Sequence, residues 1–77
     1  MTEKRAFVMI NTERGKEEDV LQKLKKIAGV SEAHEIYGVY DIVAEITADS
    51  FENIRKIIIK GIRMTAGVRS TLALIVT

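Results

Sequence analysis

The sequence predicts an α+β domain in which two helices cover one face of a four-stranded antiparallel sheet. Stretches with the period-two alternation of strands and stretches with helical spacing follow one another in the order β-α-β-β-α-β. The triplet Ala-Gly-Val occurs at 28–30 and again at 66–68, each time between a helical pattern and a strand pattern. Two such β-α-β units form a ferredoxin-like domain, and their right-handed crossovers place both helices on the same side.

The first half of the chain predicts a strand, a helix and a second strand. Residues 6–11 alternate, with Ala6, Val8 and Ile10 on one face and Phe7, Met9 and Asn11 on the other. The helix predicted at 16–28 has acidic residues in its first turn and lysines toward its end, as the helix dipole favours. Gly29 ends this helix, with Val30 placed for a Schellman contact, and the second strand covers 30–37.

The second half repeats the order of strand, helix and strand. The third strand, at 40–47, has Ile42, Ala44 and Ile46 on one face and Asp41, Val43, Glu45 and Thr47 on the other. Asp49 and Glu52 have the spacing of a capping box that opens the second helix. The apolar face of this helix comprises Phe51, Ile54, Ile57, Ile58 and Ile62. Gly61 obscures the end of the helix, and the last strand covers 69–77.

The composition is that of one small globular domain, 1–77. Its 77 residues are 47% hydrophobic and 30% charged, which excludes a disordered tail. The absence of cysteine excludes a disulfide scaffold, a thiolate zinc site and a cysteine nucleophile. The net charge of +1 gives no strong attraction to nucleic acid or anionic lipid. Neither a signal peptide nor a membrane span is visible, so we expect a soluble, cytoplasmic protein without a membrane partner.

The predicted sheet leaves apolar side chains uncovered. Phe7, Met9 and Val43 lie on the face that carries no helix, and the last strand, an edge in this topology, is apolar on both faces at 72–76. Soluble proteins generally avoid such patches and edges. We therefore predict a homodimer, at least, formed through the open sheet face.

The residues that carry chemistry are sparse. His34 is the one histidine of the sequence, so we predict no metal site and no cofactor. No serine is placed beside a base, and no Gly-rich phosphate cradle is present, so we assign no catalytic residue. The third strand has Val43 and Glu45 where RNA-binding modules of this fold carry aromatic residues, which argues against RNA recognition.

A short turn, Tyr37-Gly38-Val39-Tyr40-Asp41, lies at the midpoint of the chain. Gly38 allows the chain to reverse within two or three residues and places Tyr40 and Asp41 at the start of the third strand. A binding loop would lie there. The alternative is that Gly38 is only a hairpin glycine and Asp41 only a turn-capping acid.

Two motifs give the chain a resemblance to a known family. Gly38-Val39-Tyr40-Asp41, and then Gly67-Val68-Arg69-Ser70-Thr71 before Leu74-Ile75-Val76, resemble the effector-binding domain of the Lrp/AsnC family, also called RAM. The resemblance covers the whole chain. Full-length members carry a helix-turn-helix DNA-binding domain ahead of this one. Because the first strand begins within six residues of Met1, we expect a stand-alone form that does not bind DNA directly.

The resemblance implies a ligand and an assembly. Family members dimerise through their sheets, their dimers form larger rings, commonly octamers, and small amino acids bind between dimers. The matching ligand contacts here are Gly38, Tyr40 and Asp41 in the turn and Thr71 at the start of the last strand. We expect the ligand's ammonium on Asp41, its carboxylate on backbone amides near Gly38, and Thr71 from a neighbouring subunit. The family often has a second Thr two residues after the first, where this chain has Ala73.

Three functions are compatible with these residues. The leading hypothesis is a non-enzymatic amino-acid sensor that acts alone or co-assembles with full-length Lrp/AsnC regulators. The second is a small ferredoxin-like enzyme of the monooxygenase or isomerase kind, for which Asp41, Glu45 and His34 are the candidate titratable groups. The third is a purely structural oligomerisation module.

Overall fold

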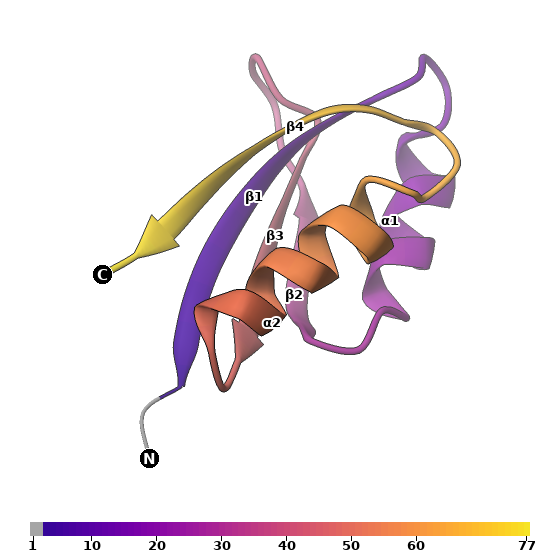
Figure 1. The fold of residues 1–77 in the computed structure, drawn as a ribbon. Coiled ribbons are helices and arrows are strands. Elements are labelled where there is room, and N and C mark those ends of the chain that lie inside the picture. The colour runs from indigo at the N-terminus through magenta and orange to yellow at the C-terminus, as the bar shows by residue number, and fades with distance from the viewer. Residues whose placement is uncertain (1–2) are drawn as a thin grey trace.

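The protein folds into one antiparallel sheet with the strand order β2-β3-β1-β4 and with both helices on one face (Figure 1). This computed structural model describes residues 3–77, so residues 1 and 2 of the predicted domain lie outside the described residues. The predicted ferredoxin-like α+β topology is confirmed. The elements are β1 (Lys4–Thr12), α1 (Glu17–Lys25), β2 (Val30–Glu35), β3 (Ile42–Ala48), α2 (Phe51–Lys56), the π-helical segment η1 (Ile57–Ile62), and β4 (Val68–Val76).

The core lies between the sheet and the helices. Alternate strand residues are buried there, which confirms the predicted faces of β1 and β3: Ala6, Val8, Ile10, Ala33, Ile42, Ala44 and Ile46. The helical residues packed against them are Val20, Leu21, Leu24, Ile54, Ile58 and Ile62. Phe51, which we expected on this buried face, is 43% exposed at the start of α2.

The repeated Ala-Gly-Val triplet forms the same turn twice. Gly29 and Gly67 both have a φ of 98°, a region that favours glycine. The amides of Val30 and Val68 each donate to the carbonyl three residues earlier, at 3.1 and 3.2 Å. The two halves of the chain therefore enter β2 and β4 by equivalent turns.

Each of these turns is also tied to the end of another strand. The Gly29 carbonyl accepts a hydrogen bond from the Thr47 amide in β3 at 2.9 Å. The Gly67 carbonyl accepts one from the Glu13 amide, directly after β1, at 2.8 Å. The second bond holds the entry to β4 beside the end of β1.

Several predicted ends need correction. α1 ends at Lys25 and not at residue 28. The amides of Lys26 and Ile27 donate to the carbonyls three residues earlier, so the chain leaves the α-helix in a tighter turn of the 3₁₀ type. The strands predicted at 6–11, 30–37, 40–47 and 69–77 occupy Lys4–Thr12, Val30–Glu35, Ile42–Ala48 and Val68–Val76.

The predicted capping box of α2 is wrong. Ser50 is the N-cap, and its hydroxyl accepts a hydrogen bond from the Asn53 amide at 3.1 Å. Asp49 instead accepts from the side-chain nitrogen of Asn53 at 2.6 Å, so it does not cap the helix with Glu52. Ser and Asp are comparable N-caps, and their adjacency made the choice ambiguous in the sequence.

The second helix continues through Gly61 as a π-helical segment. The amide of Arg63 donates to the carbonyl of Ile58, five residues back, at 2.9 Å. Gly61 lies where an added Cβ would come within 3.2 Å of a methyl of Ile27. The segment therefore lies close to the chain after α1 and ends with Arg63 beside the start of β4.

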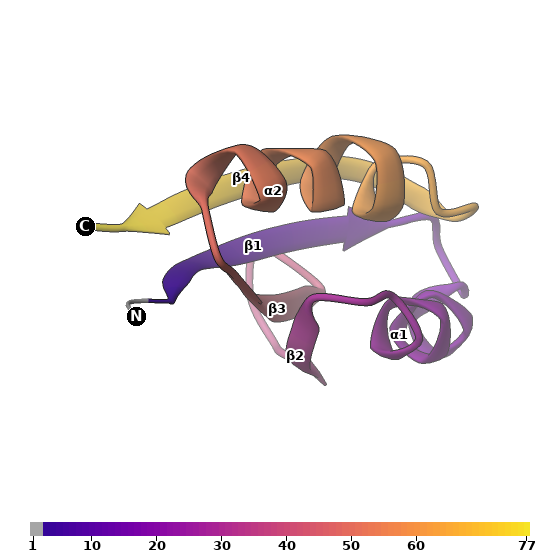
Figure 2. The same cartoon turned by 60° about the horizontal axis from the view of Figure 1, so that its bottom comes forward.

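The open face of the sheet carries an apolar stripe that crosses from β1 to its neighbours. Phe7 pairs with Leu74, and Met9 pairs with both Leu72 and Val43. Leu72 and Leu74 are 45% and 50% exposed, and β4 is an edge strand. Figure 2 shows that β1 begins and β4 ends at the same end of the sheet. Within residues 3–77 no helix is long and apolar enough to cross a membrane.

We predict that the turn glycines carry much of the fold's stability. Gly67→Ala adds a Cβ only 2.7 Å from a Val20 methyl and forces a positive φ on alanine, and Gly29→Ala overlaps Ile57 in the same way. Each should lower the free energy of unfolding by about 2 to 4 kcal/mol. Gly15→Ala, at a positive φ with no atom within 4 Å, is the control and should cost only about 1 kcal/mol. Urea denaturation measures all three, and equal losses would contradict the packing explanation.

Candidate functional site

A small polar hollow lies where β1 ends and β3 and β4 begin. It has a volume of about 220 Å³ and is lined by Asn11, Thr12, Asp41, Arg69 and Ser70. We call it the Asp41 hollow. Four of these five residues carry neutral or basic polar groups, and Asp41 is the acid among them.

Asp41 is held firmly at the base of the β2–β3 turn. Its amide donates to the Ile10 carbonyl, and its carbonyl accepts from the Ile36 amide, both at 2.9 Å. Its Oδ2 accepts from the Thr12 amide at 2.9 Å and faces the Thr12 hydroxyl at 3.4 Å. The other oxygen, Oδ1, makes no hydrogen bond to the described part of the chain. Asp41 therefore caps the end of β1 with one oxygen and keeps the second one for another partner.

Arg69 reaches this hollow because β4 contains a bulge. Asn11 pairs with Ser70 while Thr12 pairs with Val68, so Arg69 is the extra residue at this register shift. A bulge takes a side chain out of the regular alternation of its strand. Arg69 is exposed, and its guanidinium forms no ion pair within residues 3–77.

A second hollow adjoins the first one. It has a volume of about 410 Å³ and is lined by Arg63, Val68, Arg69, Ser70 and Thr71. We call it the Arg63 hollow. Arg69 and Ser70 line both hollows, so the two are neighbours along the start of β4.

The Asp41 hollow has the chemistry to hold a zwitterion. Asp41 and Arg69 line it, and their side chains form no ion pair with each other at 4.0 Å or less among the described residues. A carboxylate accepts hydrogen bonds from an ammonium, and a guanidinium binds a carboxylate with two parallel hydrogen bonds. Asn11 and Ser70, 3.4 Å apart through their side chains, add neutral polar groups.

The structure brings two of the four predicted ligand residues close together. Asp41 and Thr71 line adjacent hollows, whereas Gly38 and Tyr40 line neither. Gly38 has a φ of 141° and no atom within 4 Å of the position of an added Cβ, and its neighbours Tyr37 and Val39 are strongly exposed. The turn thus projects from the sheet as a hairpin tip (Figure 1).

Sequence reasoning missed several residues of the two hollows. Arg69 and Ser70 belong to a motif that we noted, but we gave them no role. Asn11 and Thr12 end a strand, and Arg63 follows a helix whose end the sequence left uncertain. A signal existed only for Arg69, which is a basic residue between the turn glycine Gly67 and the predicted ligand residue Thr71.

The candidate residues for an enzyme do not form one site. His34 is exposed and lies 3.0 Å from Glu32, and Glu45 forms an ion pair with Arg5 at 3.1 Å. Asp41 and His34 line different hollows. Across residues 3–77, no group of three His, Asp or Glu residues could hold a metal ion.

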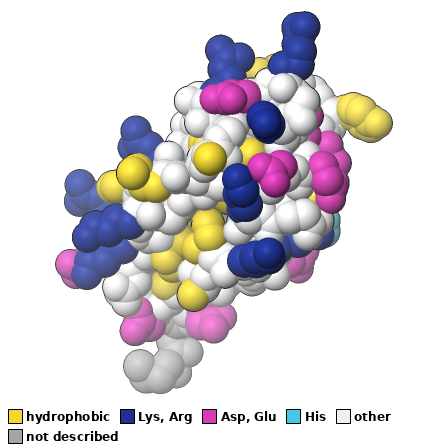
Figure 3. Space-filling view, turned by 90° about the vertical axis from the view of Figure 1, so that its right-hand side faces the viewer, with side chains coloured by type: hydrophobic (Ala, Val, Ile, Leu, Met, Phe, Trp, Pro, Cys, Tyr) yellow, Lys and Arg dark blue, Asp and Glu magenta, His cyan; other side chains and the backbone are white. Residues whose placement is uncertain are grey.

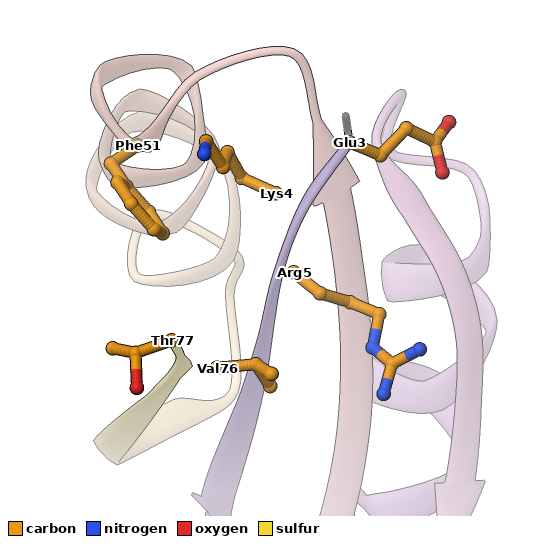
Figure 4. A pocket seen from close by; sticks show the side chains of 6 residues that line it. All are labelled: Glu3, Lys4, Arg5, Phe51, Val76 and Thr77. Atoms are coloured by element: carbon orange, nitrogen blue, oxygen red, sulfur yellow. The ribbon is translucent and has the colours of Figure 1, made fainter. Parts of the chain in front are cut away.

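Another hollow, of about 540 Å³, is lined by the beginning of β1, Phe51 and the end of β4 (Figure 4). The Lys4 ammonium lies 5.1 Å from the centre of the Phe51 ring. Arg5 and Glu3 point away from Lys4 and Phe51 (Figure 4), and Arg5 is paired with Glu45. The charged groups of this hollow therefore do not converge on one ligand position.

Comparison with known proteins identifies the family. The sequence model of the Lrp/AsnC ligand binding domain matches residues 5–77. An uncharacterised helix-turn-helix transcriptional regulator of Pyrococcus furiosus is 32% identical over 73 residues, which are 91% of this chain and 49% of that protein. The chain thus spans about half the length of this curated relative.

Solved structures give the same result. The crystal structure of FFRP-DM1 is 30% identical, with a TM-score of 0.91 over 96% of this chain and 99% of that one. Escherichia coli AsnC is 26% identical, with a TM-score of 0.88 over 95% of this chain and 50% of that one. A Neisseria meningitidis regulator in complex with L-Met, 16% identical over 96% of this chain and 49% of that one, shares the fold with a TM-score of 0.84. The chain therefore belongs to the family of Lrp/AsnC ligand-binding domains.

Proposed function

We propose that this domain binds a small amino acid at the end of its sheet and thereby acts in the regulation of transcription. The observation that carries the proposal is the Asp41 hollow, where a carboxylate and a guanidinium lie on one cavity without an ion pair between them. The family is one of ligand-binding domains, and its helix-turn-helix members are transcriptional regulators. The L-Met complex of the Neisseria regulator, which shares the fold, supports an amino acid as ligand.

In this proposal the ligand's ammonium binds the free Oδ1 of Asp41 and its carboxylate binds the guanidinium of Arg69. This assignment replaces the backbone amides near Gly38, because Arg69 lines the hollow and Gly38 does not. The hairpin tip with Gly38 and Tyr40 then closes the hollow from a neighbouring copy. Thr71 donates or accepts one further hydrogen bond from the adjoining Arg63 hollow.

The copies associate, in this proposal, through the open sheet face. The apolar stripe consists of Phe7, Met9, Val43, Leu72 and Leu74. Small soluble domains rarely leave such a contiguous apolar surface exposed to water. Burying it between two copies makes a homodimer. Dimers in turn assemble into a ring, as the octamers of the family imply, and in this proposal the ring brings the hairpin tip of one dimer to a hollow of the next.

The domain acts on promoters through a full-length Lrp/AsnC regulator and not by binding DNA itself. The net charge is +1. On the side of the molecule that carries α1, Lys and Arg side chains are interspersed with Asp and Glu (Figure 3). A surface of mixed sign does not neutralise a row of phosphates.

The dimer can be tested with a charge at the centre of the stripe. Met9→Glu should split the dimer, because burying an unpaired carboxylate in an apolar interface costs far more than burying a neutral polar group. Met64→Glu is the matched control, since Met64 is 75% exposed outside the sheet, and it should leave the mass unchanged. Light scattering measures the mass of each variant. A wild type that is monomeric at micromolar concentration, with no loss of stability on dilution, would overturn the dimer.

Amino-acid binding can be tested by calorimetry against the twenty amino acids. Asp41→Asn should weaken binding about 10- to 100-fold, because it removes the charge that pairs with the ammonium. The amide oxygen of the new Asn still accepts from the Thr12 amide, so the melting temperature should change little. Asp41→Ala removes that hydrogen bond as well and should lose about 1 to 3 kcal/mol of stability.

Asp49→Asn is the matched control, because Asp49 is an exposed acid at the opposite end of β3 and should not affect binding. If Asp41→Asn binds an amino acid as tightly as the wild type, Asp41 is only a turn-capping acid. If no amino acid binds the wild type, the sensor proposal fails and a structural oligomerisation module takes its place.

A further inference from the structure

The site contains more positive charge than a neutral amino acid needs. Arg63, at the end of η1, lines the Arg63 hollow together with Arg69 and the hydroxyl residues Ser70 and Thr71. Neither arginine forms an ion pair or a side-chain hydrogen bond within the described range 3–77. Two arginines therefore line the Arg63 hollow, which shares Arg69 and Ser70 with the hollow that contains the acid Asp41.

The position of Arg63 is set by the backbone that precedes and follows it. Its amide donates to the Ile58 carbonyl at 2.9 Å, which closes the wide turn of η1. The Thr65 hydroxyl donates to the Gly61 carbonyl at 2.9 Å, and the Thr65 amide to the Ile62 carbonyl at 3.1 Å. Hydrogen bonds on both sides thus fix the point from which the Arg63 side chain extends.

The charges can be matched to a ligand. The ammonium of an amino acid pairs with Asp41 and its carboxylate pairs with Arg69, which leaves Arg63 without a partner. The net charge of these three residues is +1, so a ligand with a net charge of −1 neutralises the site. An amino acid with a carboxylate side chain carries that net charge, and one with a phosphate side chain carries somewhat more, about −1.5 to −2 near neutral pH.

We propose that the ligand is an amino acid with an anionic side chain, either a carboxylate or a phosphate. Its α-ammonium and α-carboxylate lie in the Asp41 hollow, and its side chain extends past Ser70 into the Arg63 hollow. There Arg63 binds the anionic group, with hydrogen bonds from the hydroxyls of Ser70 and Thr71. This inference rests on the proposed amino-acid site and names the class of ligand that the site selects.

The position of Ala73 is consistent with this assignment. Ala73 lies two residues after Thr71 in β4, opposite Val8, and lines an apolar groove with Ile75 and residues of α2 and η1. The hydroxyl partners for a polar ligand side chain, Ser70 and Thr71, therefore precede Ala73 in β4 and line the Arg63 hollow.

The experiment compares ligands that differ only in side-chain charge. Calorimetry at one low ionic strength measures L-glutamate against L-glutamine, L-aspartate against L-asparagine, and O-phospho-L-serine against L-serine. We expect the anionic member of at least one pair to bind about 10-fold more tightly than its neutral partner, from one added charge-assisted hydrogen bond. The pair that shows the difference identifies a carboxylate or a phosphate as the group recognised.

Two variants assign the difference to Arg63. Arg63→Gln should remove the preference for the anionic member and change the affinity for the neutral member much less. Arg55→Gln removes the same charge from an exposed arginine of α2 that lines neither hollow, and it should keep the preference. Thermal melting checks that both variants remain folded.

The possible outcomes separate this inference from the proposed function. If neutral amino acids bind as tightly as anionic ones, or if Arg63→Gln keeps the preference, the inference fails and the amino-acid site stands. If no amino acid binds, both fail. If inorganic phosphate binds alone and no amino acid does, the arginines form a simple anion site, which also contradicts both.

Discussion

Two hydrogen bonds at the end of β1 hold the candidate site together. The Thr12 amide donates to Asp41 Oδ2, and the next amide, that of Glu13, donates to the Gly67 carbonyl. The first bond fixes the hairpin between β2 and β3, and the second fixes the turn that enters β4. Because these segments are far apart in the sequence, the end of β1 is the common support that places Asp41 and Arg69 on one hollow.

This arrangement gives Asp41 two roles that compete for one carboxylate. Oδ2 is committed to the fold, and Oδ1 is the oxygen left for a ligand. Arg69 is likewise placed by a local irregularity. The β-bulge leaves Arg69 without a partner in the strand pairing, and Arg69 lines the candidate site. Binding chemistry here therefore depends on backbone geometry at the ends of strands, while the regular core supplies rigidity.

The sequence predicted the parts of the fold that depend on local pattern. The period-two alternation in β1 and β3 located the core face, and the two Ala-Gly-Val triplets located equivalent turns at Gly29 and Gly67. It did not predict the bulge at Arg69, because a bulge depends on the pairing register of two strands that are far apart in the sequence. It also missed the π-helical segment before Arg63, since one wide turn within a run of isoleucines leaves no distinct spacing to read in the sequence. Asp41 was found from its motif, and its hydrogen bond to Thr12 became visible only in three dimensions.

The most direct test of the amino-acid site is an NMR titration that follows the backbone amides. The free protein and the protein with the best-binding amino acid are compared by the chemical shift of each amide. The predicted result is a set of large shifts that includes the residues lining the hollow at the end of β1, just before β3 and at the start of β4: Asn11, Thr12, Asp41, Arg69 and Ser70. Large shifts at Lys4 and Phe51 instead, at the other end of the sheet, would contradict the assignment of the site.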